Sequence, residues 1–441
     1  MAEISIMALY EQITDNHGKF LESLSHRFLD EDRKAALQRF EAVGFPTKKD
    51  EEYKYTNLRE ITEKEYNFFP KESHNITKEQ FDQLHLGEEN FDWIVFINGK
   101  LHKELSKISI ENVEFLSFNY ALNDAKHKEV FDTYFNTIAS KETAFTNLNL
   151  AYCKYGFFLK VPKNVVIEKP IHIFYLSQNQ EENTFYNTRN LLIVEEGAKV
   201  EIIESHHNFD NSYVFTNSVT EIFTYPNAKA DWHKLQNDND TSYLIDNTFA
   251  KQEKDSLTTV NTFSFGGKLV RNNLDFIHNG QNINSFMNGI TIIGKDQLVD
   301  HHTAVHHNFP NCESYQNYKG IFDGKSHGVF NGKVFVDKIA QKTNAYQQNN
   351  NVLLSEGATI DTKPQLEIFA DDVKCSHGCT VGQLNEDALF YLRARGISKK
   401  EAQALLLYAF ANDAMQNIDI EPLKEKVSKL LAEKLEVDIE F

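Results

Sequence analysis

The sequence predicts a mainly β protein whose long central part is flanked by helical regions at both ends. Short runs of β-branched and aromatic residues recur through this central part, separated by turns rich in Gly, Asn, Asp and Lys. Several of the turns are alike and recur roughly every 27 to 40 residues, an interval of the size expected for one coil of a solenoid. We therefore expect an N-terminal helical region over 1–90, a β core over 91–375 and a C-terminal helical domain over 376–441.

The N-terminal region is predicted to be helical between about residues 15 and 40. Apolar residues there recur at helical spacing with charged residues between them: Phe20, Leu24, Phe28, Ala35, Ala36 and Leu37. Gly44-Phe45-Pro46 ends this pattern, because glycine terminates helices and proline disfavours the helical conformation of the residue before it. The remainder, to about residue 90, is charged and mixed, and we expect helices and loops.

The central region is predicted to contain many short strands with no amphipathic helix between them. The clearest runs are 93–97, 156–161, 165–167, 171–175, 191–194, 200–203 and 334–336. Their pattern fits a parallel β-helix, a large sandwich or a propeller. The irregular interval favours the β-helix, as does the high Asn content, because Asn tolerates the left-handed conformation needed at coil corners. The strand pattern alone leaves the sandwich open.

The C-terminal region is predicted to hold three helices. Asn385 can cap the first, which carries acidic residues in its first turn and arginines in its last, and Gly396 follows it. Ser398 and Glu401 have the spacing of a capping box that opens the second helix. The third begins near Pro422. We expect these helices to pack as a small domain on the end of the β body.

Composition and charge exclude several classes of protein. The 441 residues are 41% hydrophobic and 25% charged, as in a folded chain, and carry a net charge of −18. This acidic balance argues against nucleic acid or an anionic membrane as the main partner. No apolar run is long enough for a membrane helix, and no signal peptide is evident. The four cysteines (Cys153, Cys312, Cys375 and Cys379) are therefore expected to be reduced thiols in the cytoplasm.

The segment from Gly320 to Ser326 is one residue short of a phosphate-binding Walker loop. A strand pattern follows it, whereas phosphate binding requires a helix N-terminus at that point. We interpret the segment as a β-turn and expect no ATPase site in this chain.

Four histidines lie close together in the sequence, at His301, His302, His306 and His307, next to Asp300. On a strand, His302 and His306 would share one face, and His301 and His307 the other. Two ligands on a face make half of a metal site. The alternative interpretation is a set of polar, hydrogen-bonded positions in the wall of a coil.

The segment Lys374-Cys375-Ser376-His377-Gly378-Cys379 carries the most distinctive chemistry. In an extended chain, Cys375, His377 and Cys379 project to the same side. Thiolate and imidazole are ligands for zinc or for iron–sulfur species, and a complete site needs a fourth ligand from elsewhere or from another subunit. Structural thiols, a zinc site and an iron–sulfur site all remain open at this point.

This segment resembles the C-terminal signature of the SufB/SufD family of iron–sulfur cluster assembly proteins, which extends from Pro364 to Gly378 and continues in Leu389 to Gly396. Further similar motifs lie upstream: Asp300 with Thr303 and His307, Tyr318 to Gly320, Val329 to Gly332, Ala340 to Gln348 and Leu353 to Ala358. Gly44 to Pro46, with Glu52 to Thr56, is similar to the N-terminal element of the SufD branch. Two positions differ from the family pattern, with Tyr53 where Trp is usual and Cys379 where Ala is usual.

The resemblance implies a right-handed parallel β-helix flanked by helical regions and a scaffold role without enzymatic activity. It implies pairing with SufB through the β-helices and docking of the ATPase SufC on the C-terminal helices. Cys375 and His377 would lie at the SufB interface and take part in building a transient iron–sulfur cluster, with reduced flavin as a further cofactor of the complex. A homodimer is one expected state of the isolated chain.

Two other functions are compatible with parts of the pattern. A β-helix can carry the carboxylate chemistry of a carbohydrate-active enzyme, although the distinctive residues here are thiol and imidazole. The histidine cluster could instead serve a stand-alone metal-dependent hydrolase. Metal content with and without a co-expressed ATPase partner distinguishes these functions from the scaffold.

Overall fold

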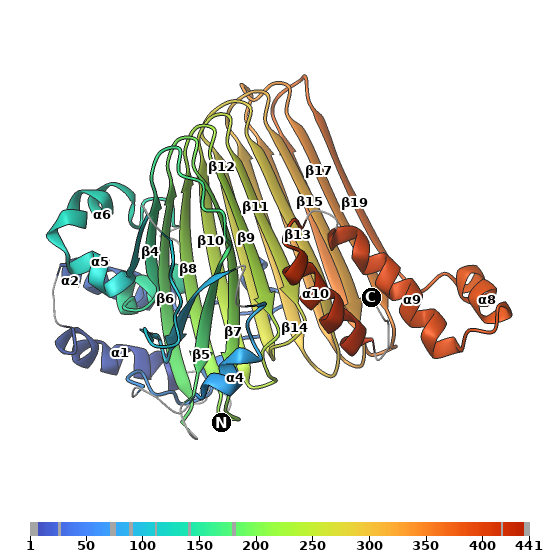
Figure 1. The fold of residues 1–441 in the computed structure, drawn as a ribbon, viewed down its shortest axis with the longest axis horizontal. Helices are drawn as coiled ribbons and strands as arrows, with labels where there is room; N and C mark the ends of the chain where they lie inside the picture. The colour runs from blue at the N-terminus through green and yellow to red at the C-terminus, as the bar shows by residue number, and fades with distance from the viewer. Residues whose placement is uncertain are drawn as a thin grey trace.

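The structure is a computed structural model that describes residues 8–24, 28–70, 76–87, 91–110, 113–139, 143–178, 182–415 and 418–435. Its body is a stack of long parallel strands that form two sheets facing each other (Figure 1). Helices of the N-terminal part lie beside the first coils, and α9 (Lys399–Asn412) and α10 (Glu421–Lys434) of the C-terminal part lie against the side of one of the two sheets near its later strands. The predicted mainly β protein with flanking helices is confirmed.

The order of strands in the two sheets identifies a parallel β-solenoid. Sheet 1 has ten strands in the order β19-β17-β15-β13-β11-β9-β7-β5-β1-β2, and sheet 2 has nine in the order β18-β16-β14-β12-β10-β8-β6-β4-β3. From β4 onward successive strands alternate between the sheets, so each coil adds one strand to each. Except for two antiparallel pairs at the start, β1 with β2 and β3 with β4, all the named strands pair in parallel. The predicted parallel β-helix is therefore confirmed, and the sandwich is excluded.

The register between neighbouring strands defines the coil. Leu269 pairs with Leu298, and Leu298 pairs with His327, so these two successive coils have the same length. The shortest step between parallel strands of sheet 2 leads from Tyr243 to Leu269, and the longest leads from Phe158 to Leu191. The coil length therefore varies less than the spacing of the turns suggested. Some corners contain Asn or Asp and no glycine, so the sequence pattern did not mark every corner as a turn.

From β6 onward, each strand of the stack is 8 to 11 residues long. The strands are β1 Asp92–Ile97, β2 Lys100–Leu101, β3 Glu114–Ser117, β4 Phe157–Val161, β5 Ile171–Ser177, β6 Thr184–Val194, β7 Lys199–Asn208, β8 Val214–Thr224, β9 Lys229–Gln236, β10 Ser242–Gln252, β11 Leu257–Ser264, β12 Leu269–His278, β13 Asn284–Ile293, β14 Leu298–His307, β15 Glu313–Phe322, β16 His327–Val336, β17 Asn344–Leu353, β18 Thr359–Ile368 and β19 Lys374–Gly382. The last strand thus extends beyond the boundary expected at residue 375.

The helices fall into three groups. They are α1 Ala8–Glu22, α2 Asp30–Val43, η2 Glu51–Tyr53, α3 Arg59–Thr62 and α4 Lys78–Asp82; then α5 Phe118–Asn123, η3 Ala125–His127, α6 Lys128–Tyr134 and α7 Ala144–Tyr152; and finally α8 Glu386–Ala394, α9 Lys399–Asn412, η4 Asp413–Met415 and α10 Glu421–Lys434. The helical pattern expected over 15–40 is divided between α1 and α2, and residues 25–27 between them lie outside the described part.

The expectation of no helix within the β region is wrong, because the second group of helices is inserted between β3 and β4. Every residue of α7 is buried, between α2 on one side and β6 and β8 on the other. A helix that is buried all round shows no amphipathic periodicity, so sequence analysis has no signal for it. The three predicted C-terminal helices are present, with the Asn385 cap and the Ser398–Glu401 capping box as expected.

The three largest apolar cores of the described residues hold the helices and the two sheets together. One fills the solenoid between the two sheets and includes Ile173, Leu192 and Trp232. A second lies between the outer face of sheet 2 and the N-terminal helices, around Phe185 and Phe215. The third lies on the outer face of sheet 1, under α4 and the C-terminal helices. The C-terminal helices therefore cover the side of the solenoid and leave its last coil open, which corrects the expectation that they pack on its end.

Asparagine has the role at the corners that its abundance suggested. Asn282 and Asn311 have positive φ angles of 58° and 61°, and Asp255, one coil before Asn282, has 59°. Asn282 Nδ2 donates to Asp255 Oδ1 at 3.0 Å, so side chains at equivalent corners also bond from coil to coil. Asn and Asp tolerate this left-handed conformation better than most residues, which explains why the corners need few glycines.

Candidate functional site

The Cys375–His377–Cys379 segment forms β19, the last strand of sheet 1. Cys375 pairs with Ala345, His377 with Gln347 and Cys379 with Asn349 of β17, which are all buried inside the solenoid. Cys379 Sγ lies 3.3 Å from Thr362 Oγ1 on the facing strand β18. The three side chains therefore share the inner face of the last coil, as the extended spacing predicted.

Among the described residues, no further coil follows β19, so this inner face lies at the open end of the solenoid. His377 and Cys379 are exposed, whereas Cys375 is half-buried against a small apolar core that includes Val334, Val336 and Ala345. Burial raises the pKa of the Cys375 thiol, so this group needs a metal ion or a nearby cation to become a thiolate at neutral pH.

The three side chains are too far apart to bind one metal ion. Cys375 and Cys379 are four residues apart, so their Cα atoms are about 13 Å apart on a strand, which two short cysteine side chains with metal–sulfur bonds of about 2.3 Å do not span. In agreement, they are not among the described groups whose His, Cys or carboxylate ligand atoms all lie within 4.8 Å of one another. The segment can offer ligands to a cluster of several metal atoms. The remaining ligands of such a cluster would have to come from outside this strand.

The histidine cluster of β14 divides between the two faces of the strand, as predicted. His301 and His307 lie inside the solenoid, where His301 packs on Tyr318. His302 and His306 lie outside, where His302 Nε2 is 3.0 Å from Asp300 Oδ1 and His306 stacks on Phe335. The four side chains therefore do not converge on one metal ion.

The outer side of this cluster fastens the N-terminal segment to the solenoid. Asp300 is buried and accepts from Arg271 Nη1 at 2.5 Å and from the Thr56 hydroxyl. The Arg271 guanidinium lies 3.9 Å from the centre of the Tyr53 ring. Two of the motifs that carry the family resemblance thus contact each other although they lie far apart in the sequence. Tyr53, where Trp is usual, still supplies an aromatic face.

Glu52→Gln is expected to destabilise the fold at neutral pH by about 1 kcal/mol, because hydrogen bonds to charged groups are worth about 1.5–3 kcal/mol and this site is partly solvated. The hydrogen bond from His302, followed by that from Lys333, lowers the pKa of Glu52 to about 2. A carboxylate with a depressed folded pKa stabilises the fold above its unfolded pKa, and loses that effect as pH falls through the folded value. The stability difference should therefore disappear between pH 4.5 and 2, measured by urea unfolding at several pH values. A pH-independent difference would contradict this.

The segment from Gly320 to Ser326 is a turn between β15 and β16, as predicted. Gly324 has a φ of 63°, and its amide donates to the Ser355 hydroxyl of the next coil at 3.1 Å. No helix follows the turn, and the amides of Lys325 and Ser326 donate to the carbonyls of Lys295 and Asp323, so they are not available to cradle a phosphate.

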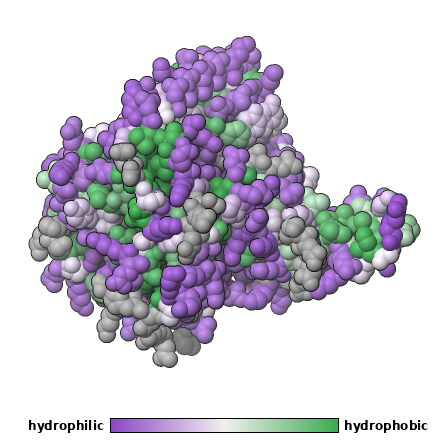
Figure 2. Space-filling model, viewed as in Figure 1, coloured by the Kyte–Doolittle hydropathy of each residue, from purple (hydrophilic) through white to green (hydrophobic). Residues whose placement is uncertain are grey.

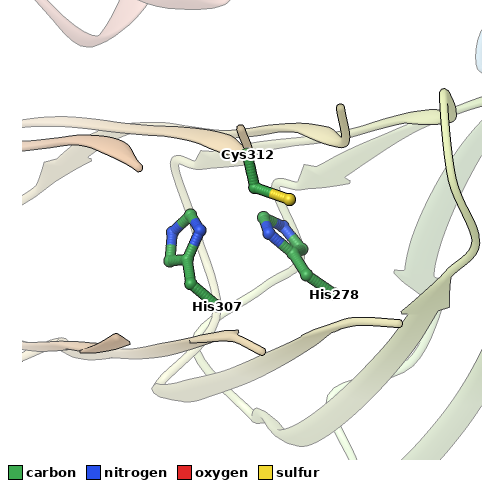
Figure 3. A group of neighbouring side chains, drawn as sticks. All are labelled: His278, His307 and Cys312. Carbon is green, nitrogen blue, oxygen red and sulfur yellow. The ribbon is translucent and has the colours of Figure 1, made fainter. Parts of the chain in front are cut away.

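One group of residues and one cavity have no signal in the sequence pattern. His278, His307 and Cys312 come together inside the solenoid (Figure 3). A cavity of about 750 Å³ lies at the N-terminal end of the stack, lined among others by Lys100, Lys103 and Lys154 and by Tyr120 and Tyr155. The three residues come from adjacent coils, and only a known coil length would have aligned them, whereas the cavity is formed by three segments around residues 100, 120 and 155.

Two family models match the chain. The model of the SufBD protein N-terminal region matches residues 3–173, and that of the SufBD core domain, described as part of SUF system FeS cluster assembly, matches residues 175–410. The chain belongs to the SufB/SufD family. It is 31% identical over 432 residues to the iron–sulfur cluster assembly protein SufD of Escherichia coli, covering 95% of this chain and 98% of that protein.

Other relatives in this family support the same assignment. A SufBD family protein of Synechocystis is 31% identical over 408 residues, covering 91% of this chain and 90% of the relative. The chloroplastic protein ABCI7 of Arabidopsis thaliana is 33% identical over 273 residues, covering 60% of this chain and 58% of the relative. The chain is thus a SufD-type member of the SufB/SufD family with a role in iron–sulfur cluster assembly. No helix in its described part has the length and apolar character that a membrane crossing requires.

Proposed function

We propose that this chain is a non-enzymatic scaffold subunit of a SufBCD complex, in which it pairs with SufB, docks SufC and contributes Cys375 and His377 to a transient cluster. The observation that carries this proposal is the position of both residues on the inner face of the last, uncovered coil. Co-expression with SufB and SufC tests it directly. The three chains should co-purify with iron and sulfide, and failure of this chain to join the other two would contradict the scaffold role.

The open end of the solenoid is the proposed SufB interface. β18 and β19 are the last strands of their sheets, and most of their residues are exposed or partly exposed. Unpaired strand edges are a template for pairing with another chain, and another β-helix could continue both sheets. The same edge would permit the homodimer expected of the isolated chain.

A cluster at this interface would be shared between subunits. Cys375 and His377 supply one sulfur and one nitrogen ligand, and the remaining ligands would come from SufB. Mixed thiolate and imidazole ligation suits a cluster that is assembled and then released. The cluster is cargo of the complex, so the chain alone need not retain it.

The proposed SufC surface is α8 together with the beginning of α9. No residue of α8 is buried, and Phe390 and Tyr391 are 74% and 58% exposed. Figure 1 shows α8 projecting beyond the solenoid, and Figure 2 shows hydrophobic residues gathered on this arm. In contrast, α10 and the second half of α9 pack on sheet 1 through Leu407, Leu423 and Leu431. A helix pair with an unused apolar face is suited to binding a partner protein.

Phe390→Ser combined with Tyr391→Ser should remove at least about 2 kcal/mol of SufC binding, because buried aromatic anchors dominate protein interfaces. Pull-down of SufC by the tagged chain measures the loss, which should exceed tenfold. Since neither side chain is buried, the β-sheet circular dichroism signal should not change. The matched control is Tyr120→Ser, an aromatic residue 60% exposed on α5, which should leave SufC binding intact. Equal SufC recovery with both variants would place the docking surface elsewhere.

The proposal also includes reduced flavin as a cofactor of the complex and the cytoplasm as the location of the protein. The cavity beside β1 and α5 has lysines for a phosphate and tyrosine faces for stacking on an aromatic ring, which suits a flavin nucleotide. When bound, reduced flavin would supply electrons to cluster assembly. No specific observation favours a carbohydrate-active enzyme, and the division of the histidine cluster between two faces speaks against the metal-dependent hydrolase.

A further inference from the structure

Two histidines and a cysteine form a compact group inside the solenoid (Figure 3). His278 ends β12, His307 ends β14, and these two residues pair directly in adjacent coils. Cys312 lies just before β15, at the corner that follows β14. One ligand atom from each residue lies within 4.8 Å of the other two, and all three residues are 0% exposed.

A chain of hydrogen bonds fixes the tautomer of His278. Gln252 donates through Nε2 to the carbonyl of Asn284 at 3.0 Å, so its Oε1 accepts the Ser285 hydroxyl at 2.6 Å. Ser285 has then used its proton and accepts from His278 Nε2 at 2.6 Å. The proton of the neutral imidazole is therefore on Nε2, and Nδ1 carries a free lone pair. In metal sites, a histidine commonly donates one ring N–H to a hydrogen-bond partner and binds the metal through the other ring nitrogen.

His307 has the same kind of environment one coil later. Its Nε2 lies 2.9 Å from the Ser314 hydroxyl, and its Nδ1, like that of His278, is buried without a hydrogen-bond partner. Burial lowers the pKa of His307 to about 3 and that of His278 well below its usual value. Each ring contacts its serine through Nε2 and keeps Nδ1 available for a metal ion.

Cys312 lies in an environment that can stabilise a thiolate once a cation is present. Burial raises the pKa of its thiol, whereas backbone N–H groups of Ile283 and Asn282 oppose that rise. In the structure the thiol is 3.2 Å from the carbonyl of Gly280. A metal ion would replace the thiol proton, and the two backbone amides would remain as donors to the bound sulfur.

We infer that His278, His307 and Cys312 bind one divalent transition-metal ion of the zinc class. Two imidazole nitrogens and one thiolate are typical ligands for such an ion, with one position left for water or a further group. Tetrahedral bonds of about 2.0 to 2.3 Å place ligand atoms about 3.3 to 3.6 Å apart, so closing the site from separations of up to 4.8 Å requires these atoms to approach one another by as much as about 1.5 Å. This site is separate from the proposed cluster ligands and does not depend on the proposed function.

The position of the site gives it a structural role. Ser314, which contacts His307, pairs with Ala345, and Ala345 pairs with Cys375. The site therefore lies two coils inward from Cys375, about 10 Å at the usual strand spacing. A metal ion there would link β12, β14 and the next corner, and so hold together the coils beneath the open end.

The fold offers an internal comparison. His172 is also buried, its Nε2 lies 2.7 Å from the Ser205 hydroxyl, and its Nδ1 has no partner. It belongs to no group of three ligand residues among the described part of the chain. A buried histidine paired with serine is therefore not a metal ligand by itself. A second histidine and a cysteine distinguish the proposed site.

The test is the metal content of the full-length chain. The unmodified protein, loaded with Zn²⁺ and dialysed, should retain about one equivalent per chain, and Co²⁺ in its place should give a thiolate charge-transfer band. Cys312→Ala should lose both signals. His172→Gln, and the double variant Cys375→Ala with His377→Ala, should keep them, which distinguishes this site from the proposed cluster ligands.

A second variant covers the case in which Cys312→Ala fails to fold. Ser285→Ala removes only the group that orients His278, and should weaken Zn²⁺ affinity by about 10–100-fold, as loss of such partners usually does. Each variant is checked by circular dichroism before metal analysis. If the unmodified chain retains no stoichiometric metal after loading, or if Co²⁺ binds without a thiolate band, the site does not exist.

Discussion

Replacing His377 by alanine is expected to reduce the iron–sulfur content of the co-expressed complex by at least about tenfold, while the yield of the complex is unchanged. Removing a mere supporting partner of a metal ligand already costs about 10–100-fold in affinity, so losing a ligand should cost at least as much. His377 is exposed on the last strand and supports no apolar core, so its removal should not disturb the solenoid. Iron and acid-labile sulfide per complex, with the visible absorbance of the cluster, measure the effect.

Two variants on the same strand make this result specific. Ser376 is exposed and points to the opposite face from His377, so Ser376→Ala should assemble clusters at the normal rate. Cys375→Ala should have a smaller effect than His377→Ala, because burial raises the pKa of the Cys375 thiol and limits its use as a ligand. If Cys375→Ala and His377→Ala both assemble clusters like the unmodified chain, the segment is structural.

The sequence predicted the fold wherever the structure depends on local patterns. The caps at Asn385 and Ser398, the helix end at Gly44 and the turn at Gly324 depend on residues near in the chain, and all are present. The prediction failed for α7. Its residues are buried on every side by contacts with α2, β6 and β8, and such contacts leave no periodic signal in the helix itself.

For the candidate sites too, the sequence predicted the features that depend on neighbouring residues and not those that depend on distant ones. The common face of Cys375, His377 and Cys379 follows from the two-residue period of a strand, and the sequence predicted it. Their position on the open coil depends on where the stack ends, which the strand pattern does not state. His278 was not noticed because its partner His307 lies one full coil further along the chain, a relation that becomes visible only when the coil length is known. The contact of Thr56 with Asp300 spans a still longer separation.

The second large effect is expected at the free edge of β19. Lys374 donates its N–H to Thr343 of the neighbouring coil, and in a parallel ladder the direction of successive N–H groups alternates. The N–H groups of His377, Cys379 and Val381 therefore point to the open edge. On β18 the Thr359 N–H donates to Ser326 of the neighbouring coil, so the alternation places Pro364 among the residues that face the open edge. Proline has no N–H to offer a partner strand there. β19 is accordingly the better edge for the proposed pairing with SufB.

Val381→Pro should therefore abolish co-purification of SufB while the chain itself stays folded. Proline is tolerated on an edge strand where its missing N–H faces solvent, but it removes a donor from the partner strand and crowds the approach of that strand. Val381→Ala is the matched control, because it shortens the same exposed side chain and keeps the N–H, and it should retain SufB. Size-exclusion chromatography of the co-expressed chains measures the complex, and thermal unfolding of the isolated variant verifies its fold. Normal pairing by a folded Val381→Pro chain would mean that SufB does not bind by extending this sheet.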